Sequence, residues 1–137
     1  MQSQHSVPLA QRGASAPEFA LAAPIIIVLL FGMLEFGMFI YSNGLVANAS
    51  REGARYGVIY SSPRKTQEEI QTKVADYLKK AGLKDPATIN ITGAQGSTGS
   101  SLSVDVRYPY NLQVLPHFVD GITGTITVNA NSTMIME

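Results

Sequence analysis

The sequence predicts an α+β protein in which one long apolar helix leads into a small head domain. In that head we expect one amphipathic helix on a roughly three-stranded antiparallel sheet. Three observations support this fold class: the apolar run Phe19–Tyr41 has the length of a membrane span, a capping box begins at Thr66, and short alternating segments follow it. With 137 residues, the chain has room for one domain beside the apolar run.

The apolar run Phe19–Tyr41 is best explained by insertion into a membrane. At about 1.5 Å per residue it reaches roughly 34 Å, enough to cross a hydrocarbon core of about 30 Å. A buried helix of a soluble domain is the alternative, but residues 25–31 are apolar on every side, and so small a domain could not cover them. Pro24 cannot donate a hydrogen bond to Ala20, so we expect the span to bend or loosen there.

Two carboxylates, Glu18 and Glu35, flank the most apolar part of this run. They would stand roughly 26 Å apart along a helix, near opposite edges of a bilayer. A carboxylate inside hydrocarbon costs about 2.5–3.5 kcal/mol, so each must either extend to its interface or find a partner. For Glu35 the sequence leaves both readings open, whereas the residues before Glu18 favour a specific role.

Gly13 stands five residues before Glu18, directly ahead of the apolar run and after a polar leader that carries Arg12. Here the sequence resembles a type IV prepilin. The resemblance implies that a prepilin peptidase cuts between Gly13 and Ala14, and that Glu18 and Phe19 serve peptidase recognition and assembly. The cut would create an amine on Ala14, which could pair with Glu18 of a neighbouring subunit as the helices stack.

Further segments narrow this resemblance to the TadE-like family of the tight-adherence (Tad) pilus system. They span positions 12–56, and the stretch Glu-Gly-Ala-Arg-Tyr at 52–56 is the most specific of them. The matching positions are Arg12–Ala14, Glu18–Leu21, Pro24, Gly32, Glu35–Gly37 and Ala49–Tyr56.

The family implies a pilin-like fold and a minor pilin or pseudopilin used in assembly of a type IVb (Flp/Tad) pilus for adhesion or secretion. A minor component is favoured because the major pilins of these systems are very short, whereas this chain carries a head. The implied partners are a prepilin peptidase, the major pilin, other minor pilins, the inner-membrane assembly platform and the lipid bilayer. The implied location is the inner (cytoplasmic) membrane, with the C-terminal domain outside the cytoplasm, and the extracellular pilus after assembly.

We expect three segments: a leader at 1–13, a membrane and extended helix at 14–60, and an exported head at 61–137 that folds on its own. Helical spacing continues past the span to about residue 59. Gly53 and Gly57 lie four residues apart, a spacing that suits close packing either against another membrane helix or against the chain's own sheet.

The head is predicted to begin with an amphipathic helix. Thr66 and Glu69 form a capping box, and an apolar face precedes Gly82. Strands are expected at Thr88–Thr92, Ser101–Tyr108 and Thr123–Met136, with a glycine- and serine-rich hairpin loop between the first two. The apolar face comprises Ile70, Val74, Tyr77, Leu78 and Ala81.

The segment from Tyr108 to Val119 is unusually apolar for a loop. Its prolines cannot extend a ladder of strand hydrogen bonds, so it could cover the edge of the sheet. The alternative is a surface that binds a partner.

The sequence indicates no enzyme. With His5 and His117 as its two histidines and with no cysteine, the chain offers no triad and no cluster of metal ligands, so we expect no catalytic, cofactor or metal residues. The glycine-rich loop lacks the lysine and the following helix of a phosphate site. The net charge of zero gives no basic footprint for nucleic acid.

Two rival functions compete with the pilin interpretation. One is an extracytoplasmic binding or adhesin domain that an uncleaved signal anchor holds at the membrane and that never enters a fibre. The other is a secreted module released by signal peptidase after Ala47–Ala49, although the apolar run is longer than a signal peptide needs.

Overall fold

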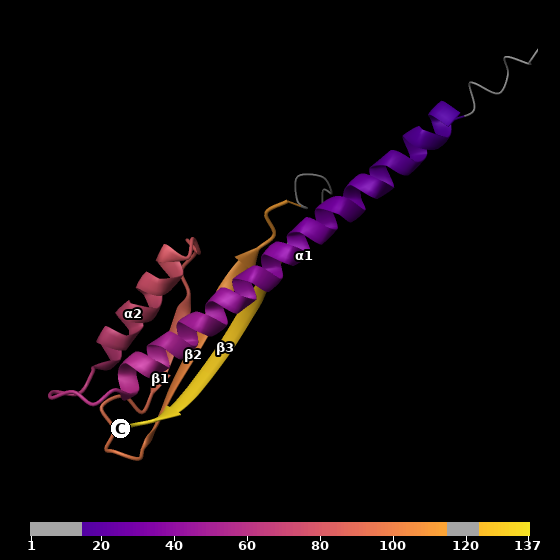
Figure 1. Ribbon diagram of the computed structural model, residues 1–137. Coiled ribbons are helices and arrows are strands. Elements are labelled where there is room, and N and C mark those ends of the chain that lie inside the picture. Colours follow the sequence, from indigo (N-terminus) through magenta and orange to yellow (C-terminus); the bar gives the residue numbers. More distant parts are fainter. Residues whose placement is uncertain (1–14, 115–123) are drawn as a thin grey trace, which may run out of the picture.

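The longest element of the computed structural model is helix α1 (Ser15–Val58), and its first half projects beyond the helix and strands of the head (Figure 1). The structure describes residues 15–114 and 124–137. The head consists of α2 (Gln67–Lys80), β1 (Thr88–Thr92), β2 (Ser101–Asn111) and β3 (Thr125–Ile135), packed along the second half of α1. The α+β class predicted from the sequence is thereby confirmed.

The two halves of α1 have different surroundings. The helix is 44 residues long and continues through Pro24 without a break, so the expected loosening there does not divide it. Around Pro24 the apolar side chains are exposed, whereas the second half turns four apolar side chains into the core of the head. These buried residues are Val46, Ala49, Ala54 and Val58.

Helix α2 begins at the predicted capping box. The Glu69 N–H donates to Thr66 Oγ1 at 3.2 Å, and the Thr66 N–H donates to Glu69 Oε2 at 2.8 Å. These two bonds satisfy backbone donors that the first turn of a helix leaves open. From there the predicted apolar face turns inward, with Ile70, Val74 and Leu78 buried.

The sheet has the strand order β1-β2-β3, with both pairs antiparallel. Strand β1 has the predicted bounds, and β3 lies inside the predicted range. Strand β2 alternates strictly, with its even-numbered residues buried against the helices. These residues are Leu102, Val104, Val106, Tyr108 and Tyr110.

Strand β2 continues three residues beyond its predicted end, which corrects the expectation of a loop from Tyr108 onward. Tyr108 pairs with Val128, and Pro109 with Thr127. A proline is tolerated more easily here because β1 pairs with β2 only from Ser103 to Arg107, so β2 is an edge strand on that side at Pro109. The second half of the expected loop, residues 115–119, lies outside the described residues.

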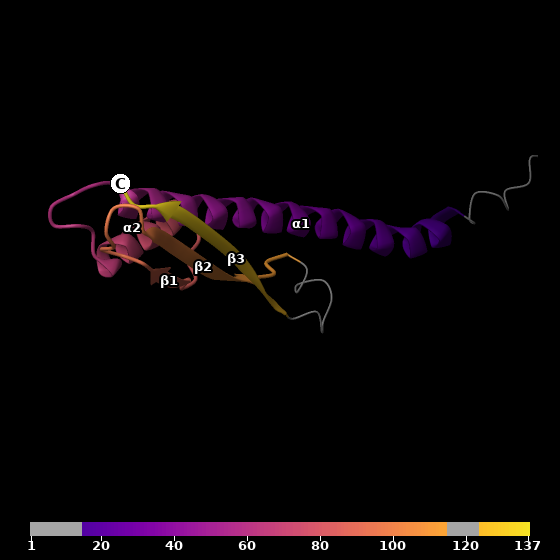
Figure 2. The same ribbon diagram turned by 90° about the horizontal axis from the view of Figure 1, so that it is seen from below.

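Close packing between α1 and the head depends on Gly53 and Gly57. A Cβ on Gly53 would collide with Val74, and a Cβ on Gly57 would stand 2.7 Å from Ile70 Cδ1. The glycines therefore let α1 lie against both α2 and the sheet, as the views in Figures 1 and 2 show. Of the two readings of this spacing, the structure supports packing against the chain's own head.

The segment boundary expected at residue 60 falls in the connection between α1 and α2, but the core extends across it. Side chains from the second half of α1 belong to the same apolar cluster as those of α2 and the sheet. Independent folding of residues 61–137 stays a prediction. In the structure, α1 contributes side chains to the apolar core of the head.

Candidate functional site

The projecting half of α1 has the exposure expected of a membrane anchor. In the most apolar window of 18 residues, 6% of the residues are buried. Ile25 and Leu29 are 64% and 58% exposed, whereas a core helix of a soluble domain would have such side chains covered. Within residues 15–114 and 124–137, α1 is the one helix long and apolar enough to cross a membrane, and it is compatible with a single-pass anchor.

Glu18 lies in the first turn of α1, where unsatisfied N–H groups and the helix dipole favour a carboxylate. It is exposed, and Phe19 beside it is 71% exposed. Within the described part of the chain, no hydrogen bond or ion pair holds the Glu18 side chain. The expected cleavage residues Gly13 and Ala14 lie outside the described residues.

Glu35, by contrast, is 4% exposed and fastens the head to α1. Its carboxylate accepts a hydrogen bond from the Tyr110 hydroxyl at 2.7 Å. It also accepts from the N–H groups of Gln113, at 3.1 Å to each oxygen, and Val114, at 2.7 Å. We call Glu35, Tyr110, Gln113 and Val114 the Glu35 clasp. The sequence left open whether the Glu35 carboxylate extends to the membrane interface or finds a partner, and the structure shows that it has partners in the head.

Tyr110 is the residue that the sequence could not connect with this site. It is buried at the end of β2, and its ring packs edge-on against Phe39 of α1, with the ring centroids 5.6 Å apart. Burial raises the pKa of the Tyr110 hydroxyl, and its hydrogen bond to Glu35 raises it further. The hydroxyl therefore stays protonated and donates to the carboxylate.

The clasp resembles an anion site built from the chain's own groups. Two successive N–H groups, at the point where β2 ends, converge on one carboxylate, and such charge-assisted bonds are stronger than neutral ones. The arrangement fixes the position of the head along and around α1.

Further along α1, one more hydrogen bond joins the helix to the head, and two others tie the end of β2 to the α2–β1 connection. The buried Ser50 hydroxyl donates to the Val104 carbonyl at 2.8 Å, next to the glycine contact. Near the clasp, the Tyr108 hydroxyl donates to Asp85 at 3.4 Å, and Asn111 Nδ2 donates to the same oxygen at 3.3 Å. Burial raises the pKa of Tyr108. The head and the second half of α1 therefore form one packed unit.

Among the described residues, no group of three or more His, Asp or Glu side chains stands close enough to hold a metal ion. One hollow on the head lies between Tyr56 of α1 and Lys73 of α2. The expectation of no catalytic or cofactor residue remains a prediction.

These features define a class of protein: an α+β head fastened to the second half of an N-terminal helix whose first half is compatible with a single-pass membrane anchor. The family model of TadE-like proteins matches residues 13–55, about a third of the chain. The match starts at the expected cleavage glycine and ends in the last turn of α1. It confirms the TadE-like resemblance, and this segment is TadE-like. No curated protein and no solved structure matches the chain.

Proposed function

We propose that this protein is a minor pilin or pseudopilin that takes part in assembly of a type IVb (Flp/Tad) pilus. The observation that carries the proposal is the overlap of three features on α1. The TadE-like match, the exposed apolar half of the helix and an exposed Glu18 at its start all fall on the same segment. The TadE-like family suggests a protein associated with the Tad pilus, and the finer role is our inference.

In this proposal a prepilin peptidase cuts after Gly13, and Ala14 becomes the new N-terminus. Its amine then stands one helical turn from Glu18, at the membrane surface. The two groups could pair within one chain, but pairing between stacked subunits would also set their register along the fibre. The exposed half of α1 supplies the apolar surface against which neighbouring helices pack.

The head has a structural rather than a catalytic role in this proposal. It stays outside the cytoplasm, beside the inner membrane before assembly and on the pilus afterwards. The partners are the major pilin, other minor pilins and the inner-membrane assembly platform. The Glu35 clasp supports this role because it transmits the position of the membrane helix to the head.

The test is the recovery of the protein with pili. Glu18→Ala should leave a processed, membrane-inserted chain that no longer co-purifies with sheared pili or with the major pilin. The matched control is Glu35→Ala, for which we expect a milder loss, because it leaves the projecting half of α1 unchanged. Incorporation of Glu18→Ala at the wild-type level would overturn the mechanism, and equal loss in both variants would assign the defect to insertion or folding rather than to pairing by Glu18. A wild-type chain that is uncleaved and absent from pili would support the signal-anchored adhesin.

A further inference from the structure

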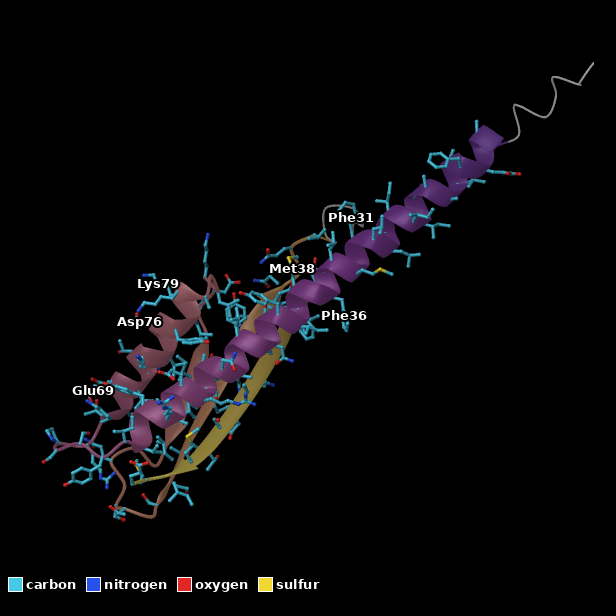
Figure 3. All side chains as sticks on the ribbon, in the orientation of Figure 1. Phe31, Phe36, Met38, Glu69, Asp76 and Lys79 are labelled. Atoms are coloured by element: carbon cyan, nitrogen blue, oxygen red, sulfur yellow. The ribbon has the colours of Figure 1, made fainter. Side chains whose placement is uncertain are left out.

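Where the head begins, α1 has one covered side and one exposed, apolar side. On the covered side, Glu35 is buried and Met38 packs against the core. On the other side, Phe36, Ile40 and Tyr41 are 63%, 53% and 64% exposed. Figure 3 shows Met38 and Phe36 on opposite sides of the helix, with Met38 toward the end of β2. Three large apolar side chains therefore lie exposed on α1 at the level of Glu35 and within the next two turns.

The part of α1 that precedes the Glu35 clasp is too short to cross a membrane on its own. From Phe19 to Leu34 it spans about 24 Å at about 1.5 Å per residue, against a hydrocarbon core of about 30 Å. The apolar surface continues to Tyr41, about 9 Å beyond Glu35 along the axis. If lipid covers that surface, the end of the head beside it lies at the depth of the lipid boundary.

We call this end the head base and define it as residues 110–114 and 124–126, which join β2 and β3 to the segment between them. It contains no charged residue, and Ile126 is 44% exposed. One exposed lysine, Lys84, lies nearby on the α2–β1 side, where it lines a hollow together with Asp85 and the head-base residue Gln113. The long side chain of a lysine can reach phosphate oxygens from such a rim. The composition therefore suits a phospholipid surface.

We propose that the head base lies in the boundary between the phospholipid headgroups and the acyl chains, so that the head rests on the membrane. This inference depends on the membrane insertion of α1 in the proposed function. It also accounts for the clasp. At that depth water is scarce, so the N–H groups of Gln113 and Val114 need an acceptor from the protein, and Glu35 supplies it.

Depth measurements on the full chain test this inference. The protein has no cysteine, so a single introduced cysteine can carry an environment-sensitive fluorophore at one chosen position. Gln113→Cys and Ile126→Cys report on the head base, and both side chains are exposed. The chain would be reconstituted in vesicles of phosphatidylcholine and phosphatidylglycerol, and quenching by acyl-brominated lipid would be measured.

Two control positions separate this inference from membrane insertion itself. Leu29→Cys lies in the projecting half of α1. Ser97→Cys lies at the opposite end of the head, where Gly99 bonds to Met136 and Glu137 bonds to Val58. That end is about 35 Å from Glu35 along α1.

We expect strong quenching at Leu29, clear quenching of at least half that strength at Gln113 and Ile126, and none at Ser97. Quenching at Leu29 with none at either head-base position would overturn the inference while leaving the anchor intact. No quenching at Leu29 would overturn the insertion of α1 and the inference with it. Circular dichroism of each labelled chain should match the wild type, because the substituted side chains are exposed.

Discussion

Replacing Glu35 with alanine should detach the head from α1 at its membrane end. The carboxylate accepts bonds from the Tyr110 hydroxyl and from two backbone N–H groups, at distances of 2.7–3.1 Å. A hydrogen bond to a charged group contributes about 1.5–3 kcal/mol, and an unsatisfied buried donor costs about 1–3 kcal/mol. Because the two N–H groups are partly buried, water would replace some of this loss. We expect Glu35→Ala to lower the free energy of unfolding by about 2–4 kcal/mol.

Amide hydrogen exchange measures this loss of stability at the two backbone N–H groups that bond to Glu35. In detergent micelles the amides of Gln113 and Val114 should be protected in the wild type and should exchange much faster in Glu35→Ala. Tyr110→Phe should cost about 1 kcal/mol and leave both amides protected. In a double-mutant cycle, Glu35 and Tyr110 should couple by about 1 kcal/mol or more.

Glu52→Ala is the matched control on the same helix. Glu52 stands 4.0 Å from Lys73, and both side chains are more than a third exposed, so this pair should contribute less than about 1 kcal/mol. Equal amide exchange at Gln113 and Val114 in the wild type and in Glu35→Ala would refute the clasp. So would a coupling energy of zero between Glu35 and Tyr110.

Three further predictions follow from the packing of the head. Gly57→Val should destabilise the protein by about 1–3 kcal/mol, because the new side chain overlaps residues of α2 and β2. The control Gly44→Ala should be tolerated, since its Cβ meets no atom within 4 Å. Equal melting temperatures for the two variants would contradict the close approach of α1 to the head. A fragment that begins at Ser42 should melt at a higher temperature than one that begins at Ser61, since it keeps the buried side of α1; a fragment from Ser61 of equal stability would show that α1 adds nothing to the core. Burial and a neighbouring carboxylate raise the pKa of Tyr110. Its contribution to the free energy of unfolding is therefore present below about pH 10 and is lost as the pH rises above the ordinary tyrosine value. Tyr110→Phe should flatten this alkaline decline in stability, and parallel profiles of stability against pH in the two proteins would argue against it.

Local features of the head could be predicted because their causes are close in sequence. The capping box at Thr66 and the apolar spacing after it set α2, and alternation within five residues set β1. The predicted end of β2, at Tyr108, was wrong for a physical reason. A proline argues against a strand interior, but Pro109 lies where β1 no longer pairs with β2.

The Glu35 clasp could not be derived from the sequence. Its donors lie 75 to 79 residues further along the chain, and two of them are backbone groups that no residue pattern marks. The signal that was present is a lone carboxylate in an apolar run, which called for a partner without naming it. Similarly, the spacing of Gly53 and Gly57 predicted a close approach, but which surface approaches depends on tertiary packing.

The mass of the intact protein, isolated from its native membranes, tests the central claim most directly. Processing by a prepilin peptidase after Gly13 would yield a chain that begins at Ala14, with Glu18 as its fifth residue. Gly13→Leu should block this processing and leave the longer chain. A native protein that begins at Met1 would contradict the account and support an uncleaved signal anchor. One that begins at Ser50 would also contradict it, because the head would then be released without the exposed half of α1.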